Sequence, residues 1–239
     1  STHNTSLPPK YCYIMNIPKV LTLSLRAFLC SLLWILGSAS SINAEDAGKL
    51  LFMGDSMTGW MAERVNAYGE ANGFEVAAIV WDGSTIRKWG NCSDKIKEYV
   101  EQIDPDAVFI CLGLNESAEK HPEQRLSDSF SAIIEAIGDR DIVWVGPPSW
   151  PGKDYGQSLN SWLAGELGES RYFDSLSLSL PRQSATNPHP SREGMNVWAD
   201  ALLRWVSDNS DVSLPGGKQP AVSHKRGSVF IYRKMKESL

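Results

Sequence analysis

The stretch KLLFMGDS, residues 49–56, joins a short apolar run to a glycine, an aspartate and a serine. A continuous apolar run of this length is typical of a β-strand that is covered on both faces. Beyond it, apolar residues recur at helical spacing as far as Asn72-Gly73, where a helix is expected to end: Met57, Trp60, Met61, Val65 and Tyr68. The stretch therefore predicts a buried strand that turns into a helix close to Ser56.

The same alternation of strand and helix recurs along the chain. Further strands are predicted over residues 75–80, 107–112, 142–145 and 171–173, with helical patterns between them and a last helix over 192–206. Repeated strand–helix units favour a parallel sheet that is wrapped by helices on both faces. The predicted fold class is α/β: a three-layer α/β/α sandwich with a central, mostly parallel five-stranded sheet.

Length and composition indicate one globular domain. The chain has 239 residues, of which 42% are hydrophobic and 21% charged, and these values leave no room for a second large core. The domain is predicted over residues 45–207, followed by a polar, basic tail, residues 208–239, that is expected to be mobile. The short apolar run Val229–Tyr232 is the only feature that indicates packing of the tail against the domain. The net charge of -5 gives no reason to expect binding to nucleic acid.

Residues 1–44 are interpreted as an upstream segment and a signal peptide. From Met15 a short basic stretch precedes the apolar run Ala27–Leu36, and small or polar residues follow up to Ala44. This is the three-part pattern of a secretory signal, and it predicts export after cleavage near Ala44. The alternative is a membrane anchor. However, the apolar run is only half of the ~20 residues that span a bilayer, so no transmembrane segment is expected in the mature chain.

Cysteine and histidine positions give no indication of a metal site. Cys92 and Cys111 are the two cysteines beyond Ala44, and Cys111 falls in a predicted buried strand, where a free thiol is common. Two free thiols are therefore expected, although an exported protein can hold a disulfide. The four histidines share no ligand spacing, and no phosphate-binding glycine motif follows a strand. Neither a metal nor a cofactor is predicted.

Four polar segments follow predicted strands or precede the last helix. They are Gly54-Asp55-Ser56, Asp82-Gly83-Ser84, Gly113-Leu114-Asn115 and Asn187-Pro188-His189. Because sites in parallel α/β folds collect at the carboxyl ends of the strands, these segments are expected to meet. Each also has a structural explanation: Ser56 suits a helix N-cap, Gly83 and Asn115 suit ordinary turns, and His189 suits a solvent-exposed connection.

Together, the four segments resemble the sequence blocks of the SGNH (GDSL-type) hydrolases, and the resemblance covers roughly residues 48–206. It implies a flavodoxin-like fold and a serine esterase in which Ser56 is the nucleophile and His189 the general base. It also implies an oxyanion hole formed by the backbone N–H groups of Ser56 and Gly83 and the side chain of Asn115.

One position departs from this family. Its members usually carry an aspartate three residues before the histidine, whereas this chain has Thr186. Three explanations remain open. The enzyme works as a Ser–His dyad with a backbone carbonyl orienting His189, another carboxylate such as Asp174 or Glu193 substitutes, or the domain has lost its activity.

The substrate is predicted from export, the compact domain and the tryptophans. Trp81, Trp89 and Trp150 fall in or beside the loops expected to rim the site, where indole rings could stack on sugars. This favours hydrolysis of short-chain acyl esters, such as O-acetyl groups, on a small-molecule or carbohydrate substrate. The alternatives are a lysophospholipase or thioesterase, which needs a long apolar groove, and a silent domain that binds glycan or assists another protein.

Overall fold

The computed structural model describes residues 48–239; the predicted upstream segment and signal peptide, residues 1–44, lie outside the described residues. The elements follow in chain order: β1 (Lys49–Gly54), α2 (Thr58–Asn72), β2 (Glu75–Trp81), α3 (Ile86–Gly90), α4 (Ser93–Ile103), β3 (Ala107–Cys111), the 3₁₀ turn η1 (Leu114–Glu116), α5 (Pro122–Arg125), α6 (Ser127–Ile137), β4 (Asp141–Val145), α7 (Gln157–Leu167), β5 (Tyr172–Phe173), α8 (Arg192–Asn209) and β6 (Phe230–Arg233).

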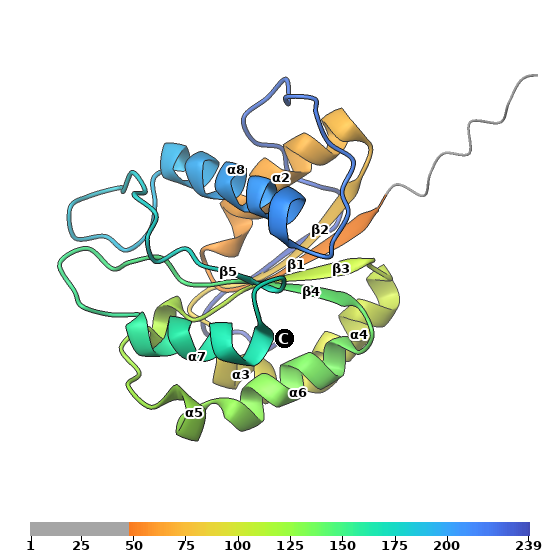
Figure 1. The fold of residues 1–239 in the computed structure, drawn as a ribbon. Coiled ribbons are helices and arrows are strands. Elements are labelled where there is room, and N and C mark those ends of the chain that lie inside the picture. Colours follow the sequence, from red (N-terminus) through yellow and green to blue (C-terminus); the bar gives the residue numbers. More distant parts are fainter. Residues whose placement is uncertain (1–47) are drawn as a thin grey trace, which may run out of the picture. The chain divides into compact units, whose positions relative to one another are not determined.

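The strands form one parallel sheet in the order β5-β4-β3-β1-β2-β6 (Figure 1). All five predicted strands are present, and β1 lies in the interior of the sheet between β3 and β2. Its central place explains why Leu50–Met53 are all apolar, since neighbouring strands and helices cover them on every side. The predicted α/β class is confirmed.

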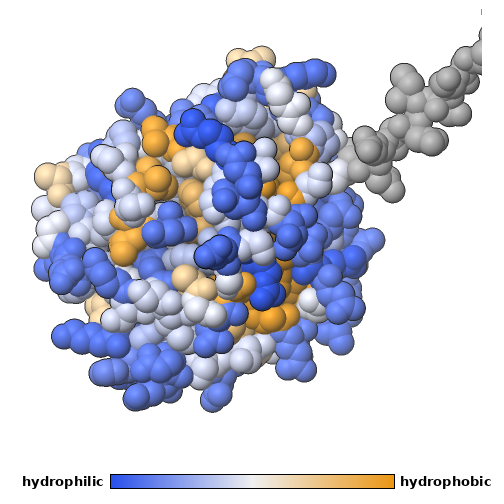
Figure 2. Space-filling model, viewed as in Figure 1, coloured by the Kyte–Doolittle hydropathy of each residue, from blue (hydrophilic) through white to orange (hydrophobic). Residues whose placement is uncertain are grey.

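Helices cover both faces of the sheet. Successive residues of a strand point to opposite faces, and on β1 the side chains of Leu50 and Phe52 join a core with α2 and α8. Leu51 and Met53 join the opposite core, with α3, α4, α6 and α7. Figure 1 shows these two layers above and below the sheet. Figure 2, in the same view as Figure 1, shows a mainly hydrophilic surface with hydrophobic residues in patches between polar ones.

The sixth strand was not predicted, and it corrects the expectation of a mobile tail. Phe230–Arg233 pairs in parallel with β2, from Ala78↔Phe230 to Trp81↔Arg233, and Phe230 is buried. The preceding segment is held by α2: Lys225 N donates to Glu63 O at 2.9 Å, and Asn66 Nδ2 donates to Lys225 O at 3.1 Å. Backbone pairing and polar side chains of α2 thus hold this part of the tail, with little apolar burial of its own.

Both cysteines of the described domain are free thiols, as expected. Cys111, the last residue of β3, is buried, and its Sγ lies 3.7 Å from the Sδ atom of Met61 on α2. It therefore serves as a small apolar core residue rather than as part of a disulfide.

The register of the sheet determines where the first polar segment lies. Gly54, the last residue of β1, is opposite Val80 of β2 and Cys111 of β3. A Cβ atom at position 54 would lie 2.1 Å from the carbonyl oxygen of Cys111, so only glycine fits there. Asp55 N donates to that same oxygen at 3.1 Å. The turn that carries Ser56 is therefore fixed against the end of β3.

Candidate active site

Ser56 lies in the turn between β1 and α2 and is partly exposed. Helix α2 begins at Thr58, and its N-cap position is occupied by Met57, with no side-chain cap. The hydroxyl of Ser56 is therefore not used as a helix cap, which was the structural alternative for this residue. Instead, the turn is closed by the carboxyl group of Asp55, whose Oδ1 accepts a hydrogen bond from Met57 N at 2.9 Å.

The hydroxyl of Ser56 lies opposite the imidazole of His189. Ser56 Oγ is 2.9 Å from His189 Nε2, although the two residues are 133 positions apart in the chain. His189 is half-buried and belongs to the loop before α8, while Ser56 follows β1. The separation is that of a hydrogen bond between a nucleophile and its base. The structure therefore brings together the two residues that the sequence analysis named as nucleophile and base.

The second nitrogen of the imidazole meets Asn187. His189 Nδ1 lies 3.0 Å from Asn187 Oδ1, and the backbone N–H of His189 donates to the same oxygen at 2.9 Å. An amide oxygen accepts and does not donate, so this contact favours the tautomer with its proton on Nδ1. In that tautomer, Nε2 is free to accept the proton of the Ser56 hydroxyl.

Asn187 was not identified from the sequence as a partner of His189. Thr186 is exposed, and the Asp174 carboxyl accepts from Leu176 N at 2.8 Å. The partner of Nδ1 is thus the side chain of Asn187, and not Thr186, a backbone carbonyl or either of the carboxylates considered from the sequence, Asp174 and Glu193. A local signal did exist, because asparagine side chains often accept from the backbone N–H two residues further on, and here that residue is His189.

Arg182 fastens the loop that carries His189. Its guanidinium donates to the carbonyl oxygen of Pro188 and, at 2.7 Å, to that of Ser149. Ser191 begins α8 as an N-cap whose Oγ accepts from Gly194 N at 3.1 Å. The imidazole is therefore held between a bonded loop and a capped helix.

The surroundings favour the neutral form of the His189 imidazole. Burial lowers the pKa of His189 below its usual value near 6.5, and the positive charge of Arg182 acts in the same direction. The carboxylate of Asp82 raises the pKa and opposes both effects. Since a base must be unprotonated to accept a proton, a lowered pKa keeps it competent at neutral pH.

The loops of Gly83 and Asn115 are bonded to each other. Asn115 Nδ2 donates to Ser84 O at 2.8 Å and lies 3.5 Å from Asp55 Oδ2. In the next residue, the Glu116 carboxyl accepts from Ile86 N at 2.8 Å at the start of α3. The ends of β1, β2 and β3 thus form one connected edge that carries Ser56, Gly83 and Asn115.

Gly83 adopts a conformation that favours glycine, and the C-terminal segment lies against it. Its φ is +63°, in the left-handed region. A Cβ atom there would lie 2.5 Å from the Cε atom of Met235, and Met235 is 61% exposed. The C-terminal segment therefore reaches the rim of the candidate site, a contact that the sequence analysis did not predict.

Two of the three tryptophans proposed for sugar stacking belong to the core. Trp89 is completely buried, and its Nε1 donates to Ser84 Oγ at 2.8 Å. Trp81 is 5% exposed, with the ammonium group of Lys88 over its ring. Neither indole has a free face, so their proposed role in stacking is wrong. Trp150 is half-buried, edge-on to Tyr155, in the loop after β4.

Burial raises the pKa of Asp55 to about 7, because its carboxyl group is 1% exposed beneath the turn of Ser56. A carboxyl whose pKa is higher in the folded than in the unfolded state stabilises the fold most at low pH. Its contribution is present below the ordinary pKa near 4 and is lost as the pH rises through about 7.

We therefore expect Asp55→Asn to reduce the pH dependence of stability. Asparagine does not ionise, and its Oδ1 can still accept from Met57 N. The free energy of unfolding of the variant, taken relative to that of the wild type, should rise by up to about 3 kcal/mol between pH 5 and pH 8, as measured by urea unfolding. Asp94→Asn, at an exposed position of α4, is the matched control. If the free energies of unfolding of Asp55→Asn and wild type differed by the same amount at pH 5 and pH 8, this account of Asp55 would be contradicted.

Among residues 48–239, no group of three or more His, Cys, Asp or Glu side chains is arranged to hold a metal ion. Within the same residues, none of the helices combines the length and the apolar character needed to cross a membrane.

Comparisons with known proteins give similarities of fold alone. No protein-family model and no curated protein matches the chain. Among solved structures, it is similar to a protein assigned to a lipolytic G-D-S-L family from Desulfitobacterium hafniense DCB-2, with 17% identity and a TM-score of 0.46, covering 66% of this chain and 98% of that one. It is also similar to a Clostridium thermocellum family 3 carbohydrate esterase, with 17% identity and a TM-score of 0.49, covering 67% and 95%.

A third similar structure is a two-domain esterase active on acetylated mannans, with 13% identity and a TM-score of 0.47. The match covers 81% of this chain but 58% of that esterase. Because all three TM-scores are 0.49 or lower, the function is inferred from the side chains of this chain and not from these relatives.

Proposed function

We propose that this chain is a serine esterase of the SGNH type, with Ser56 as nucleophile and His189 as general base. The observation that carries the proposal is the 2.9 Å separation of Ser56 Oγ and His189 Nε2, with Nδ1 of the same ring facing the Asn187 oxygen. A hydroxyl, an imidazole and an acceptor in this order are the parts of an activated nucleophile.

The reaction follows from the positions of these atoms. Ser56 Oγ attacks the carbonyl carbon of an ester while its proton passes to His189 Nε2. The tetrahedral intermediate collapses as His189 returns the proton to the leaving alcohol, which leaves an acyl group on Ser56. Water then attacks the acyl group, giving its proton to His189. As the bond between the acyl carbon and Ser56 Oγ breaks, His189 returns this proton to Oγ, which restores the Ser56 hydroxyl and releases the carboxylic acid.

The oxyanion of the intermediate is assigned to three donors: the backbone N–H groups of Ser56 and Gly83 and the side-chain amide of Asn115. One N–H of the Asn115 amide donates to Ser84 O and so fixes the amide beside the loop of Gly83, while its second N–H is the one assigned to the oxyanion. Such a donor is typically worth about 3 kcal/mol in transition-state stabilisation.

Asn187 is proposed as a positioning residue in place of the usual aspartate. Its Oδ1 bonds both the ring and the backbone N–H of His189, so it selects both the tautomer and the ring orientation. A neutral amide cannot offset the positive charge that His189 gains during the reaction. Asp82 is the carboxylate whose charge acts on this imidazole, in opposition to Arg182.

The proposed substrates are short-chain acyl esters, with O-acetyl groups on carbohydrate as the preferred class. Two observations support a short acyl group and a polar alcohol. The Met235 side chain lies against Gly83, and a groove beside Asn115 is lined mainly by charged residues. The reaction uses water and requires no cofactor. Export after cleavage near Ala44 remains a proposal based on the pattern of residues 15–44.

Hydrolysis of a p-nitrophenyl ester series tests the proposed function. We expect kcat/KM to fall from acetate through butyrate to octanoate, and release of acetate from acetylated sugars. A preference for octanoate would instead favour a lysophospholipase or thioesterase. If folded protein turned over none of these esters but bound glycan, the proposed esterase function would be contradicted. The alternative of a catalytically silent, glycan-binding domain would then remain.

A further inference from the structure

A groove beside Asn115 is available for the alcohol part of the substrate. It has a volume of about 540 Å³, within the usual range for sites that hold small molecules. The groove is formed by the start of α3, the loop after β3 and the end of α5. Asn115 lies in its wall and also belongs to the connected edge that carries Ser56 and Gly83.

Carboxylates of the groove are already bonded to the protein. The two oxygens of Glu116 accept from the backbone N–H groups of Ile86 and Arg87, at 2.8 and 3.3 Å. Glu119 Oε1 accepts from the backbone N–H of Lys120 at 3.0 Å, and its Oε2 pairs with Arg125 at 3.3 Å. Both acids therefore serve to shape the groove.

Cations remain available in the same groove. Arg87 and Lys120 are exposed, whereas the guanidinium of Arg125 is engaged by Glu119. Arg87 uses one Nη2 contact, to the backbone oxygen of Arg125 at 3.2 Å, which leaves the rest of its guanidinium open to a ligand. With three cations against two carboxylates in its lining, and both carboxylates bonded to the protein, the groove offers donors and a net positive charge.

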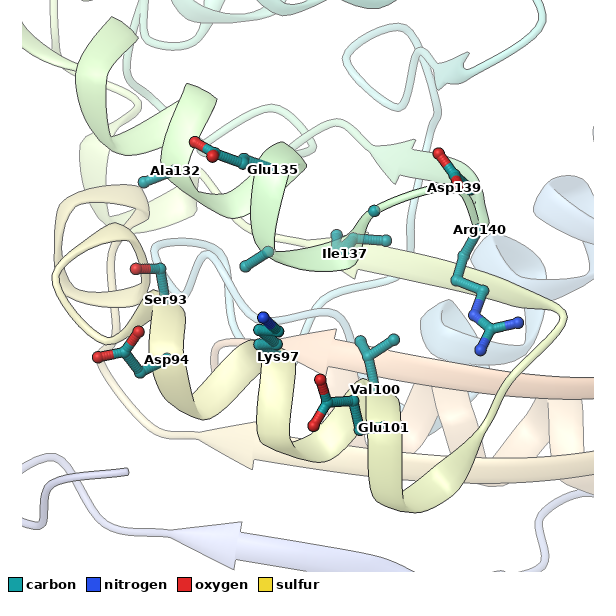
Figure 3. A pocket seen from close by; sticks show the side chains of 12 residues that line it. Ser93, Asp94, Lys97, Val100, Glu101, Ala132, Glu135, Ile137, Asp139 and Arg140 are labelled. Atoms are coloured by element: carbon teal, nitrogen blue, oxygen red, sulfur yellow. The ribbon is translucent and has the colours of Figure 1, made fainter.

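A second hollow, between α4 and α6, is not connected to Ser56 and His189 in the way that the groove beside Asn115 is. Figure 3 shows its lining side chains, among them Asp94 and Lys97 on α4 and Glu135 on α6. Its volume is about 690 Å³, larger than the groove beside Asn115, yet none of the candidate site residues lines it. Volume alone therefore does not identify the substrate side of the molecule.

We propose that the groove beside Asn115 binds the alcohol part of the ester, and that this part is an oxygen-rich group carrying a carboxylate, such as a sugar acid. The proposal rests on the proposed esterase function and adds the class of alcohol. Guanidinium and ammonium groups suit a carboxylate, and hydroxyls of a sugar suit the remaining donors.

A matched pair of substrates tests the proposal. Acetylated methyl galacturonoside and acetylated methyl galactoside differ at C6, where the first has a carboxylate and the second a hydroxymethyl group. The wild type should favour the acid in kcat/KM by about fivefold at low salt, and the preference should shrink at high salt. Lys120→Ala and Arg87→Ala should each reduce the ratio by about twofold, and the double variant should remove it.

Lys97→Ala provides the matched control, because Lys97 is an exposed lysine of the hollow between α4 and α6. It should leave the acid-to-neutral ratio unchanged. A wild-type acid-to-neutral ratio of one, or a ratio that Lys120→Ala and Arg87→Ala leave unchanged, would overturn the proposal for the groove. If turnover is still lost in Ser56→Ala protein, the proposed esterase function stands independently of that result.

A binding measurement keeps the two proposals distinguishable if no ester is turned over. Methyl galacturonoside is titrated into Ser56→Ala protein, and backbone amide shifts are followed by NMR. Shifts centred on Arg87, Asn115 and Lys120 that weaken in Lys120→Ala would support the groove even without catalysis. Absence of shifts at these residues would overturn it, whatever the outcome for esterase activity.

Discussion

Ser56→Ala is expected to lower kcat for p-nitrophenyl acetate by about 10⁴-fold or more. The reason is that the substitution removes the oxygen that forms the acyl-enzyme, while the fold around the turn is held by Asp55 and Gly54 and not by the serine hydroxyl. His189→Ala should cost a similar factor. The double variant should be little worse than either single variant, because the two residues act as one unit.

Ser184→Ala is the control for this experiment, since Ser184 is an exposed serine in the same loop as His189. Its turnover should match the wild type. If Ser56→Ala protein, shown to be folded, retained wild-type turnover, then Ser56 could not be the nucleophile.

Replacement of Asn187 is expected to have the second-largest effect. Asn187→Ala removes the acceptor at His189 Nδ1 and frees the ring to adopt the other tautomer, so kcat should fall by about 10²-fold. KM should change little, because Asn187 bonds the imidazole rather than the substrate. This split between kcat and KM distinguishes a positioning residue from one that binds substrate.

Asn187→Asp tests the same residue in the opposite direction. A carboxylate beside Nδ1 favours the charged imidazole, so the pKa of His189 should rise and the acid limb of kcat/KM should move to higher pH. Above that limb, kcat should equal or exceed the wild-type value. Thr186→Ala, at the neighbouring exposed position, should shift neither quantity. Equal pH profiles for wild type and Asn187→Asp would contradict the proposed role.

The central strands could be predicted because their chemistry is local. Apolar runs such as Leu50–Met53 can be buried on both faces only inside a covered parallel sheet, and they occur as β1 to β5. Strand β6 could not be predicted in the same way. The apolar run Val229–Tyr232 was its one local signal, and it is short and mostly not buried. The strand is held by pairing with β2, and the segment before it by contacts with α2, and these partners lie outside residues 208–239.

The convergence of Ser56 and His189 was predictable from the rule that strand ends share one edge of the sheet. The orientation of single side chains was not. Trp81 and Trp89 flank Gly83 in sequence, but their indoles are buried in the core, since Trp81 is the last residue of β2 and Trp89 lies on the buried face of α3. Asn187 was not predicted, because the expected acceptors were a backbone carbonyl or a carboxylate, whereas the acceptor in the structure is a side-chain amide.

The most direct test of the account is covalent labelling of the nucleophile. A fluorophosphonate transfers its phosphonyl group to an activated serine oxygen: the O–P bond forms as the P–F bond breaks, and the serine proton passes to His189. Mass spectrometry of the digested protein locates the adduct. The account predicts one adduct, on Ser56, that is lost in His189→Ala protein. Folded wild-type protein that leaves Ser56 unlabelled, or that labels it equally well without His189, would contradict an activated Ser56–His189 pair.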